Sequence, residues 1–96
     1  MRVGFSILKE IKDKRADISG QVYGLKDVEF ERMIKLLEKQ GYIERILRVG
    51  DRFSLKPARL LEKGERFLME HVELADEYPD SMEKLKEWIR ADRAKE

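Results

Sequence analysis

The sequence predicts a mainly α fold with a small antiparallel β hairpin, on three observations. An amphipathic helical pattern over residues 27–40 leads directly into a hairpin pattern over residues 42–55. Further helical patterns lie before and after this pair, over 4–15, 18–24, 58–73 and 80–93. With 96 residues, the chain suits one domain with a single modest core. This order of elements is that of a winged helix-turn-helix with an extra C-terminal helix.

The helix over 27–40 is predicted by apolar residues at spacings of three and four, which are Phe30, Met33, Ile34 and Leu37. Such spacing places them on one face of a 3.6-residue helix, where they can be buried together. Asp27 is placed to accept hydrogen bonds from the first free backbone N–H groups, and Gly41 can take the left-handed conformation that commonly closes a helix.

The hairpin is predicted from the residues that follow Gly41. An extended run, rich in β-branched and apolar residues, begins at Tyr42 and continues through Val49 with imperfect alternation. Gly50-Asp51 is a turn signal, and Arg52 to Leu55 returns as the second strand. Pro57 excludes a long central strand beyond that point.

The N-terminal helix, over 4–15, is predicted to bury Phe5, Ile7, Leu8 and Ile11 while Lys9, Glu10, Lys12 and Asp13 face out. The segment over 18–24 is expected to be a short or irregular helix, because Gly20 and Gly24 weaken it. Gly64 lies within the helix over 58–73, where glycine costs stability unless another backbone packs closely against it.

Pro79 separates this helix from the last one, whose apolar stripe is Met82, Leu85, Trp88 and Ile89. We expect residues 1–73 to form the winged helix-turn-helix core and residues 74–96 to add a C-terminal helix, within a single domain overall. The stripe either packs on the core, which the small size of the chain favours, or pairs with a second copy to make a homodimer. Trp88 would be a strong anchor in the second case.

Charge gives no simple sign of nucleic-acid binding, since 21 Lys and Arg oppose 20 Asp and Glu for a net charge of +1. The distribution is more informative. Residues 41–60 carry 5 basic and 2 acidic residues, whereas residues 71–96 carry 5 basic and 8 acidic ones. The predicted hairpin is therefore basic, and the C-terminal part is acidic.

Several classes of protein are disfavoured. The chain has no cysteine, and so neither a disulfide framework nor a thiolate metal site is expected. No apolar run has the length of a membrane span and no signal-peptide core is present, which makes the cytoplasm the expected compartment. His71 is the single histidine and cannot be combined with the serines into a nucleophilic centre. We expect no enzyme activity, metal or cofactor, and read His71 as a helix C-terminal residue near the dipole.

Three segments carry a resemblance to a known family: ILKEI (7–11), FERMIKLLEKQGYI (30–43) and LLEKGERFL (60–68). Together they resemble the YjcQ-type family of small bacterial winged-helix proteins, over about two thirds of the chain. The most specific pieces are Gly41-Tyr42-Ile43 and the Lys63-Gly64 pair. Many winged-helix regulators have a threonine where this chain has Leu61, so a capping hydroxyl is missing here. The resemblance implies a winged-helix fold and a suspected nucleic-acid-binding role, often in prophage-like settings, with no established activity and no site residues.

The candidate DNA-binding residues are Arg32, Lys35, Lys39, Arg45, Arg48, Arg52 and Lys56. In the hairpin, the arginines either grip phosphates or form an ordinary solvated strand face. On the central helix, Arg32, Lys35 and Lys39 face outward, and Arg32 is the best placed for a guanine edge. Glu29, Glu31 and Glu38 on the same helix oppose this reading, and we favour a mixed-charge surface with pairs such as Glu31–Lys35.

Two functions follow as hypotheses. The first is a DNA-binding, transcriptional-regulator-like module with the hairpin arginines on double-stranded DNA. The second is a protein–protein interaction module that uses the same fold without nucleic acid, for which the candidate residues are Met82, Leu85, Trp88 and Ile89. A basic patch that joins hairpin and helix favours the first, and an exposed apolar patch around Trp88 favours the second.

Overall fold

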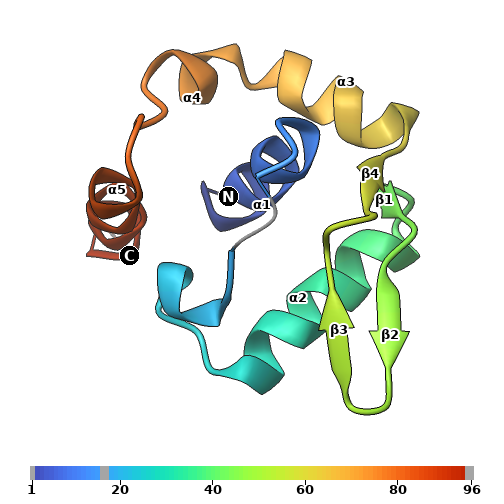
Figure 1. Ribbon diagram of the computed structural model, residues 1–96. Helices are drawn as coiled ribbons and strands as arrows, with labels where there is room; N and C mark the ends of the chain where they lie inside the picture. The colour runs from blue at the N-terminus through green and yellow to red at the C-terminus, as the bar shows by residue number, and fades with distance from the viewer. Residues whose placement is uncertain (1, 16–17, 95–96) are drawn as a thin grey trace.

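The computed structural model describes residues 2–15 and 18–94, and the side chains of these through residue 92. The elements in chain order are α1 (Arg2–Lys12), the 3₁₀ helix η1 (Gly20–Tyr23), α2 (Asp27–Lys39), β1 (Ile43–Glu44), β2 (Leu47–Val49), β3 (Arg52–Ser54), β4 (Arg59–Leu60), α3 (Glu62–Glu70), α4 (Val72–Asp76) and α5 (Met82–Ala94). Helices surround α1, and the β2–β3 hairpin projects beside α2 (Figure 1). The predicted mainly α fold with a small antiparallel hairpin is confirmed.

The predicted hairpin is present, with Gly50-Asp51 as its turn. Strands β2 and β3 are antiparallel, and Val49 pairs with Arg52 and Leu47 with Ser54. The base of the hairpin is a second short antiparallel pair, in which Ile43 of β1 lies opposite Leu60 of β4.

The continuous extended run predicted over 42–49 is wrong, because Arg45 takes the left-handed conformation with φ of 65° and divides it into β1 and β2. The cause is the spacing of the inward residues. Ile43 is buried and Ile46 half-buried, three positions apart, whereas a continuous strand alternates with a period of two. The break at Arg45 resets the alternation, so that Leu47 and Val49 point outward and remain exposed.

Helix α2 has the predicted bounds within one residue, and Gly41 closes it as expected. Gly41 has φ of 84°, and the Tyr42 N–H donates to the Leu37 carbonyl at 3.0 Å. The predicted capping role of Asp27 is wrong, because Asp27 is already helical and the capping position is Lys26. There the Lys26 N–H donates to Glu29 Oε1 at 2.8 Å, so the carboxylate three residues into the helix closes its start.

The helix predicted over 58–73 is two helices, since residues 59–60 pair as β4 and the chain turns at His71 between α3 and α4. His71 Nδ1 donates to the Phe67 carbonyl at 2.8 Å, and its ring stacks on the Phe67 ring at 4.2 Å. That side-chain bond replaces the backbone bond that a continuing α-helix would make. His71 therefore ends α3, in agreement with the predicted C-terminal position.

Gly64 satisfies the condition set by the sequence, because another backbone does pack against it. A Cβ at position 64 would collide with the Tyr42 carbonyl oxygen, which accepts the Leu61 N–H at 2.9 Å. Next to it, Lys63 Nζ donates to the Gln40 carbonyl at 2.9 Å and lies 4.8 Å from the centre of the Tyr42 ring. The Lys63-Gly64 pair thus fixes the start of α3 on the junction of α2 and β1.

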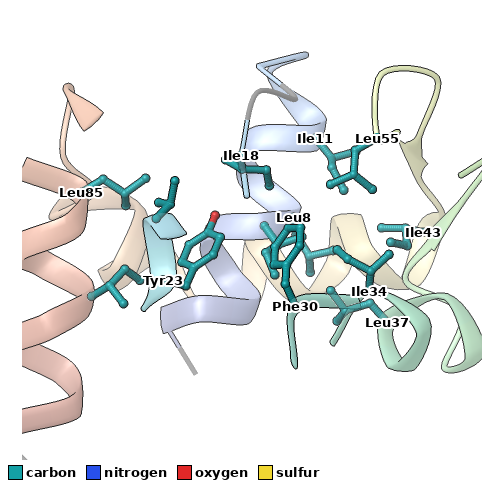
Figure 2. Close-up of a cluster of buried hydrophobic side chains, with 13 residues drawn as sticks. Leu8, Ile11, Ile18, Tyr23, Phe30, Ile34, Leu37, Ile43, Leu55 and Leu85 are labelled. Carbon is teal, nitrogen blue, oxygen red and sulfur yellow. The ribbon is translucent and has the colours of Figure 1, made fainter. Parts of the chain in front are cut away.

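The core contains side chains from both ends of the chain (Figure 2). Leu8 and Ile11 of α1 meet Phe30 and Ile34 of α2, and Leu85 reaches the same cluster from α5. Helix α5 packs on η1 and α1, where Leu85 and Ile89 are each 2% exposed. The C-terminal helix is therefore part of one continuous core.

Helix α1 ends at Lys12, three residues earlier than predicted, and the chain turns through Lys14 with φ of 57°. The expected outward position of Glu10 is wrong. Glu10 is 5% exposed, accepts a hydrogen bond from the Tyr78 hydroxyl at 3.0 Å and lies 3.0 Å from Arg15 Nε. Periodicity alone assigned Glu10 to the surface because it is charged, but a buried carboxylate is tolerated when it has such partners.

Candidate nucleic-acid interface

The outward face of α2 combines cations with apolar side chains. Its exposed cations are Arg32, Lys35 and Lys39 and its exposed apolar residues are Val28 and Leu36; Asp27 and Glu29 are exposed at the start of the same helix. Lys35 Nζ lies 3.4 Å from Glu31, but Arg32 and Lys39 have no ion pair within the described part of the chain. Val28 is 59% exposed and Leu36 48%, whereas Phe30, Ile34 and Leu37 are buried on the other side of the helix.

The three glutamates of α2 are all engaged by other groups. Glu29 accepts the Lys26 N–H, Glu31 pairs with Lys35, and Glu38 pairs with Arg48. Two of them, Glu31 and Glu38, follow the side of the helix that faces the hairpin. Glu38 is therefore held on the hairpin side, away from Arg32 and Lys39, whereas Asp27 and Glu29 at the start of α2 are exposed.

Arg48 is held against α2 by a double hydrogen bond. Its Nη2 donates to Glu38 Oε1 at 2.9 Å and its Nη1 to Glu38 Oε2 at 3.4 Å. The hydrogen bond to Glu38 raises the pKa of Arg48, so the guanidinium stays charged. Both side chains are partly exposed, and the pair fixes the hairpin to the helix. Arg48, a candidate phosphate contact from the sequence, is therefore already bound to Glu38.

The strand register explains which hairpin residues face α2. Arg48 and Phe53 are opposite one another on the inner side, and the Phe53 ring stacks on Phe30 at 5.9 Å. Val49 and Arg52 are opposite one another on the outer side. Leu47 and Val49 are 52% and 67% exposed there, so the outer face of the hairpin is partly apolar.

The remaining cations in and near the hairpin differ in whether a carboxylate lies close to them. Arg45, in the turn between β1 and β2, lies 3.9 Å from Glu44. Arg52 and Lys56 are exposed and form no ion pair with any described residue. Arg59, which follows the hairpin, pairs with Glu44 across the β1–β4 pair. Arg52 and Lys56 are accordingly the hairpin cations most available to an anion.

A hollow of about 510 Å³ lies between α2 and the hairpin, lined in part by Asp27, Glu31, Asp51, Arg52 and Lys56. Its floor includes Phe30, Phe53 and Leu55. The carboxylates within it would repel a phosphate, whereas Arg52 and Lys56 lie on the β3 side. An anionic partner is therefore better accommodated along the outward face of α2 and the hairpin than inside the hollow.

The C-terminal stripe lies inside the protein, except for Met82. Leu85 and Ile89 belong to the core, and Met82 is 42% exposed. Trp88 is half-buried, with its ring edge-on to Tyr78 at 5.4 Å and the Arg2 guanidinium 4.6 Å from its centre. The stripe thus packs on the chain's own core, and Leu85 and Ile89 cannot contact a partner while the core is intact.

Sequence reasoning missed a buried polar cluster between α1, η1 and the start of the last segment. Ser6 Oγ lies 2.9 Å from the hydroxyls of both Tyr23 and Tyr78, and Tyr78 donates to Glu10. Burial raises the pKa of Tyr23 and of Tyr78, so both stay protonated and can donate. The cluster connects residues far apart in sequence, and no local pattern could have indicated it.

Other kinds of site were also sought. Across residues 2–15 and 18–94, no group of three or more His, Cys, Asp or Glu side chains is arranged to hold a metal ion. In the same residues, no helix is both long and apolar enough to cross a membrane.

The molecule so described is a small, mainly helical protein in which a helix with a basic outward face is joined to an antiparallel hairpin. Its sequence is similar to that of an uncharacterised protein, YjcQ, from Bacillus subtilis strain 168. The two are 29% identical over 92 residues, which cover 93% of this chain and 96% of YjcQ. The resemblance to the YjcQ-type family is confirmed by this similarity. No protein-family model matches the chain, and no solved structure matches it significantly.

Proposed function

We propose that the protein is a winged-helix DNA-binding module of the kind found in transcriptional regulators. In this proposal α2 is the recognition helix and the β2–β3 hairpin is the wing. In this proposal the protein binds DNA and catalyses no reaction, and it acts in the cytoplasm of a bacterial cell.

The observation that carries the proposal is a pair of cations on the outward face of α2. Arg32 and Lys39 face solvent and form no ion pair with any described residue, whereas Glu31 and Glu38 are paired with Lys35 and Arg48. This arrangement offsets the net charge of only +1, because affinity for DNA depends on local cations that can replace counterions.

The exposed apolar side chains of α2 also fit a groove-reading role. Recognition helices contact base edges mainly through their N-terminal residues, and Val28 and Arg32 lie in the first half of α2. An arginine suits the guanine edge, and an apolar side chain suits the thymine methyl group. Val28 and Arg32 are therefore assigned to base contacts, and Lys39, Arg52 and Lys56 to phosphates.

The test is a fluorescence-anisotropy titration with mixed-sequence duplex DNA at about 50 and 200 mM salt. The variant Lys39→Gln/Arg52→Gln, which removes two of the cations assigned to phosphates, should bind more weakly, with a slope of log affinity against log salt shallower by about 2. The control Arg59→Gln/Arg66→Gln removes the same charge from arginines paired with Glu44 and Glu62, and should match the wild type. If the wild type shows no binding at the lower salt, DNA binding is refuted.

One observation favours a second candidate, the protein–protein interaction module. Leu47 and Val49 are exposed side by side on the outer face of the hairpin, where apolar side chains contribute nothing to phosphate contacts. This candidate gains support if the wild type fails to bind DNA. Its contact residues would then be sought on the hairpin, because Leu85 and Ile89 of the C-terminal helix are buried.

A further inference from the structure

Helix α5 has a basic side that faces η1. Lys86 and Arg90 of α5 line a hollow of about 130 Å³ together with Gln21, Gly24 and neighbouring residues of η1. Residues four apart on a helix have their Cβ atoms about 6 Å apart, so the two side chains can reach one common group. The sequence concealed this side, because the C-terminal segment as a whole has an acidic surplus.

Some charged residues of α5 are in ion pairs and others are not. Lys84 lies 3.6 Å from Asp80, and Asp92 lies 3.7 Å from Arg2. Lys86 and Arg90 are exposed and form no ion pair with any residue that the structure describes. Glu83 and Glu87 are exposed on the same helix, but neither is in an ion pair with them. These two cations on the η1 side are therefore available to an anion.

The size of the hollow limits the ligand. At about 30 Å³ per water molecule, 130 Å³ corresponds to about four waters. A phosphate group fits such a space. The rest of a nucleotide, or a whole peptide, would have to remain outside the hollow. Two adjacent cations above a shallow hollow suit one phosphodiester of a longer chain.

The position of this surface relative to α2 fits the same duplex. In Figure 1 the hairpin runs beside α2, and α5 lies past η1, away from the hairpin. The longest dimension of the protein is 35 Å, close to the rise of about 34 Å for one turn of B-DNA. With α2 in the major groove, the hairpin and α5 would flank it on opposite sides.

We propose that Lys86 and Arg90 form a second phosphate clamp, which holds the DNA backbone on the side of α2 opposite the wing. This inference rests on the proposed function and extends it, since it gives the C-terminal helix a role in binding as well as in the core. The wing and the clamp would together fix the orientation of α2 in the groove, because phosphate contacts set register.

The experiment compares Lys86→Gln/Arg90→Gln with a matched control, Lys84→Gln/Arg66→Gln, on mixed-sequence duplex DNA between about 50 and 200 mM salt. Both variants lose two charges. In the control they come from exposed residues paired with Asp80 and Glu62, away from η1. Thermal unfolding by circular dichroism checks that all three proteins are equally folded.

We expect the clamp variant to bind at least ten-fold more weakly at the lower salt, with a salt slope shallower by about 2, and the control to bind as the wild type does. If both variants match the wild type, or both weaken alike, DNA binding stands and the clamp is refuted. If the wild type does not bind DNA, the proposed function fails and the clamp fails with it.

Discussion

Single residues in this protein hold elements together through contacts that a sequence pattern cannot display. Lys63 donates to the end of α2 and Gly64 lies against the Tyr42 carbonyl, so two adjacent residues fix α3 to the α2–β1 junction. These are also the residues that carry the resemblance to the YjcQ-type family, together with Gly41-Tyr42-Ile43. The resemblance thus has a structural reason, because its two most specific pieces contact one another.

The two glycines in α-helices, Gly64 and Gly4, should respond in opposite ways to replacement by alanine. Gly64→Ala gains about 0.5–1 kcal/mol of helix propensity but forces a Cβ against a carbonyl that cannot rotate away, at a cost of about 1–3 kcal/mol. We expect a net loss in the free energy of unfolding. Gly4, in α1, has open space around its missing Cβ, so Gly4→Ala should be stabilising. Urea unfolding measures both, and a stabilising Gly64→Ala would contradict the close approach.

Removal of one hydroxyl from the buried cluster of Ser6, Tyr23, Tyr78 and Glu10 should lower stability measurably. Tyr78→Phe removes the donor to Glu10 Oε1 and a partner of Ser6, and should lower the free energy of unfolding by about 1–3 kcal/mol. Tyr42→Phe is the control, because its ring packs on Phe67 while no described residue bonds its hydroxyl. Equal stability of the two variants in urea unfolding would show that the cluster contributes nothing.

At the scale of elements, the helix–hairpin unit is stabilised by groups that also limit what it can bind. Arg48 and Glu38 fix the hairpin on α2, next to the packing of Phe53 on Phe30. The same pair neutralises a hairpin arginine that would otherwise be free to meet a phosphate. Structure and binding therefore compete for Arg48.

This competition predicts that loss of a carboxylate, Glu38, should increase the affinity for DNA. Glu38→Gln should bind duplex DNA more tightly than the wild type, because it frees Arg48, and its salt slope should steepen by about 0.9. Glu62→Gln on α3 removes the same charge from a residue paired with Arg66, and should leave the affinity unchanged. The two are compared by anisotropy at about 50 mM salt; a Glu38→Gln protein that binds no better than Glu62→Gln refutes the competition.

Local patterns were sufficient for the existence and order of most elements. The spacing of Phe30, Ile34 and Leu37 defined α2, and Gly50-Asp51 located the hairpin turn. The failures have tertiary causes. The break at Arg45 follows from which isoleucines reach the core, and the burial of Glu10 depends on Tyr78, which is 68 residues away. The sequence predicted which cations make up the candidate site. It could not predict that some of them are held in ion pairs with carboxylates.

At the scale of the whole molecule, both ends of the chain meet in one core. Arg2 donates to the Trp88 carbonyl at 2.8 Å, and Leu85 and Ile89 lie in the cluster that contains Leu8 and Ile34. If the chain were divided into two independent units at residue 73, α5 could separate from the rest without exposing that cluster. The packing of α5 on η1 and α1 argues that the helix and the core unfold together.

Trp88 allows a direct test, since it is the single tryptophan and lies on α5. We expect its fluorescence and the far-ultraviolet circular dichroism to report the same thermal midpoint, as for a two-state domain. Leu85→Ala should lower both midpoints together, by an amount that corresponds to about 2–5 kcal/mol, because it leaves a cavity between α5 and η1. A fluorescence transition that precedes the loss of helix would instead make α5 a separable arm. The clamp of Lys86 and Arg90 would then be held less rigidly than the wing.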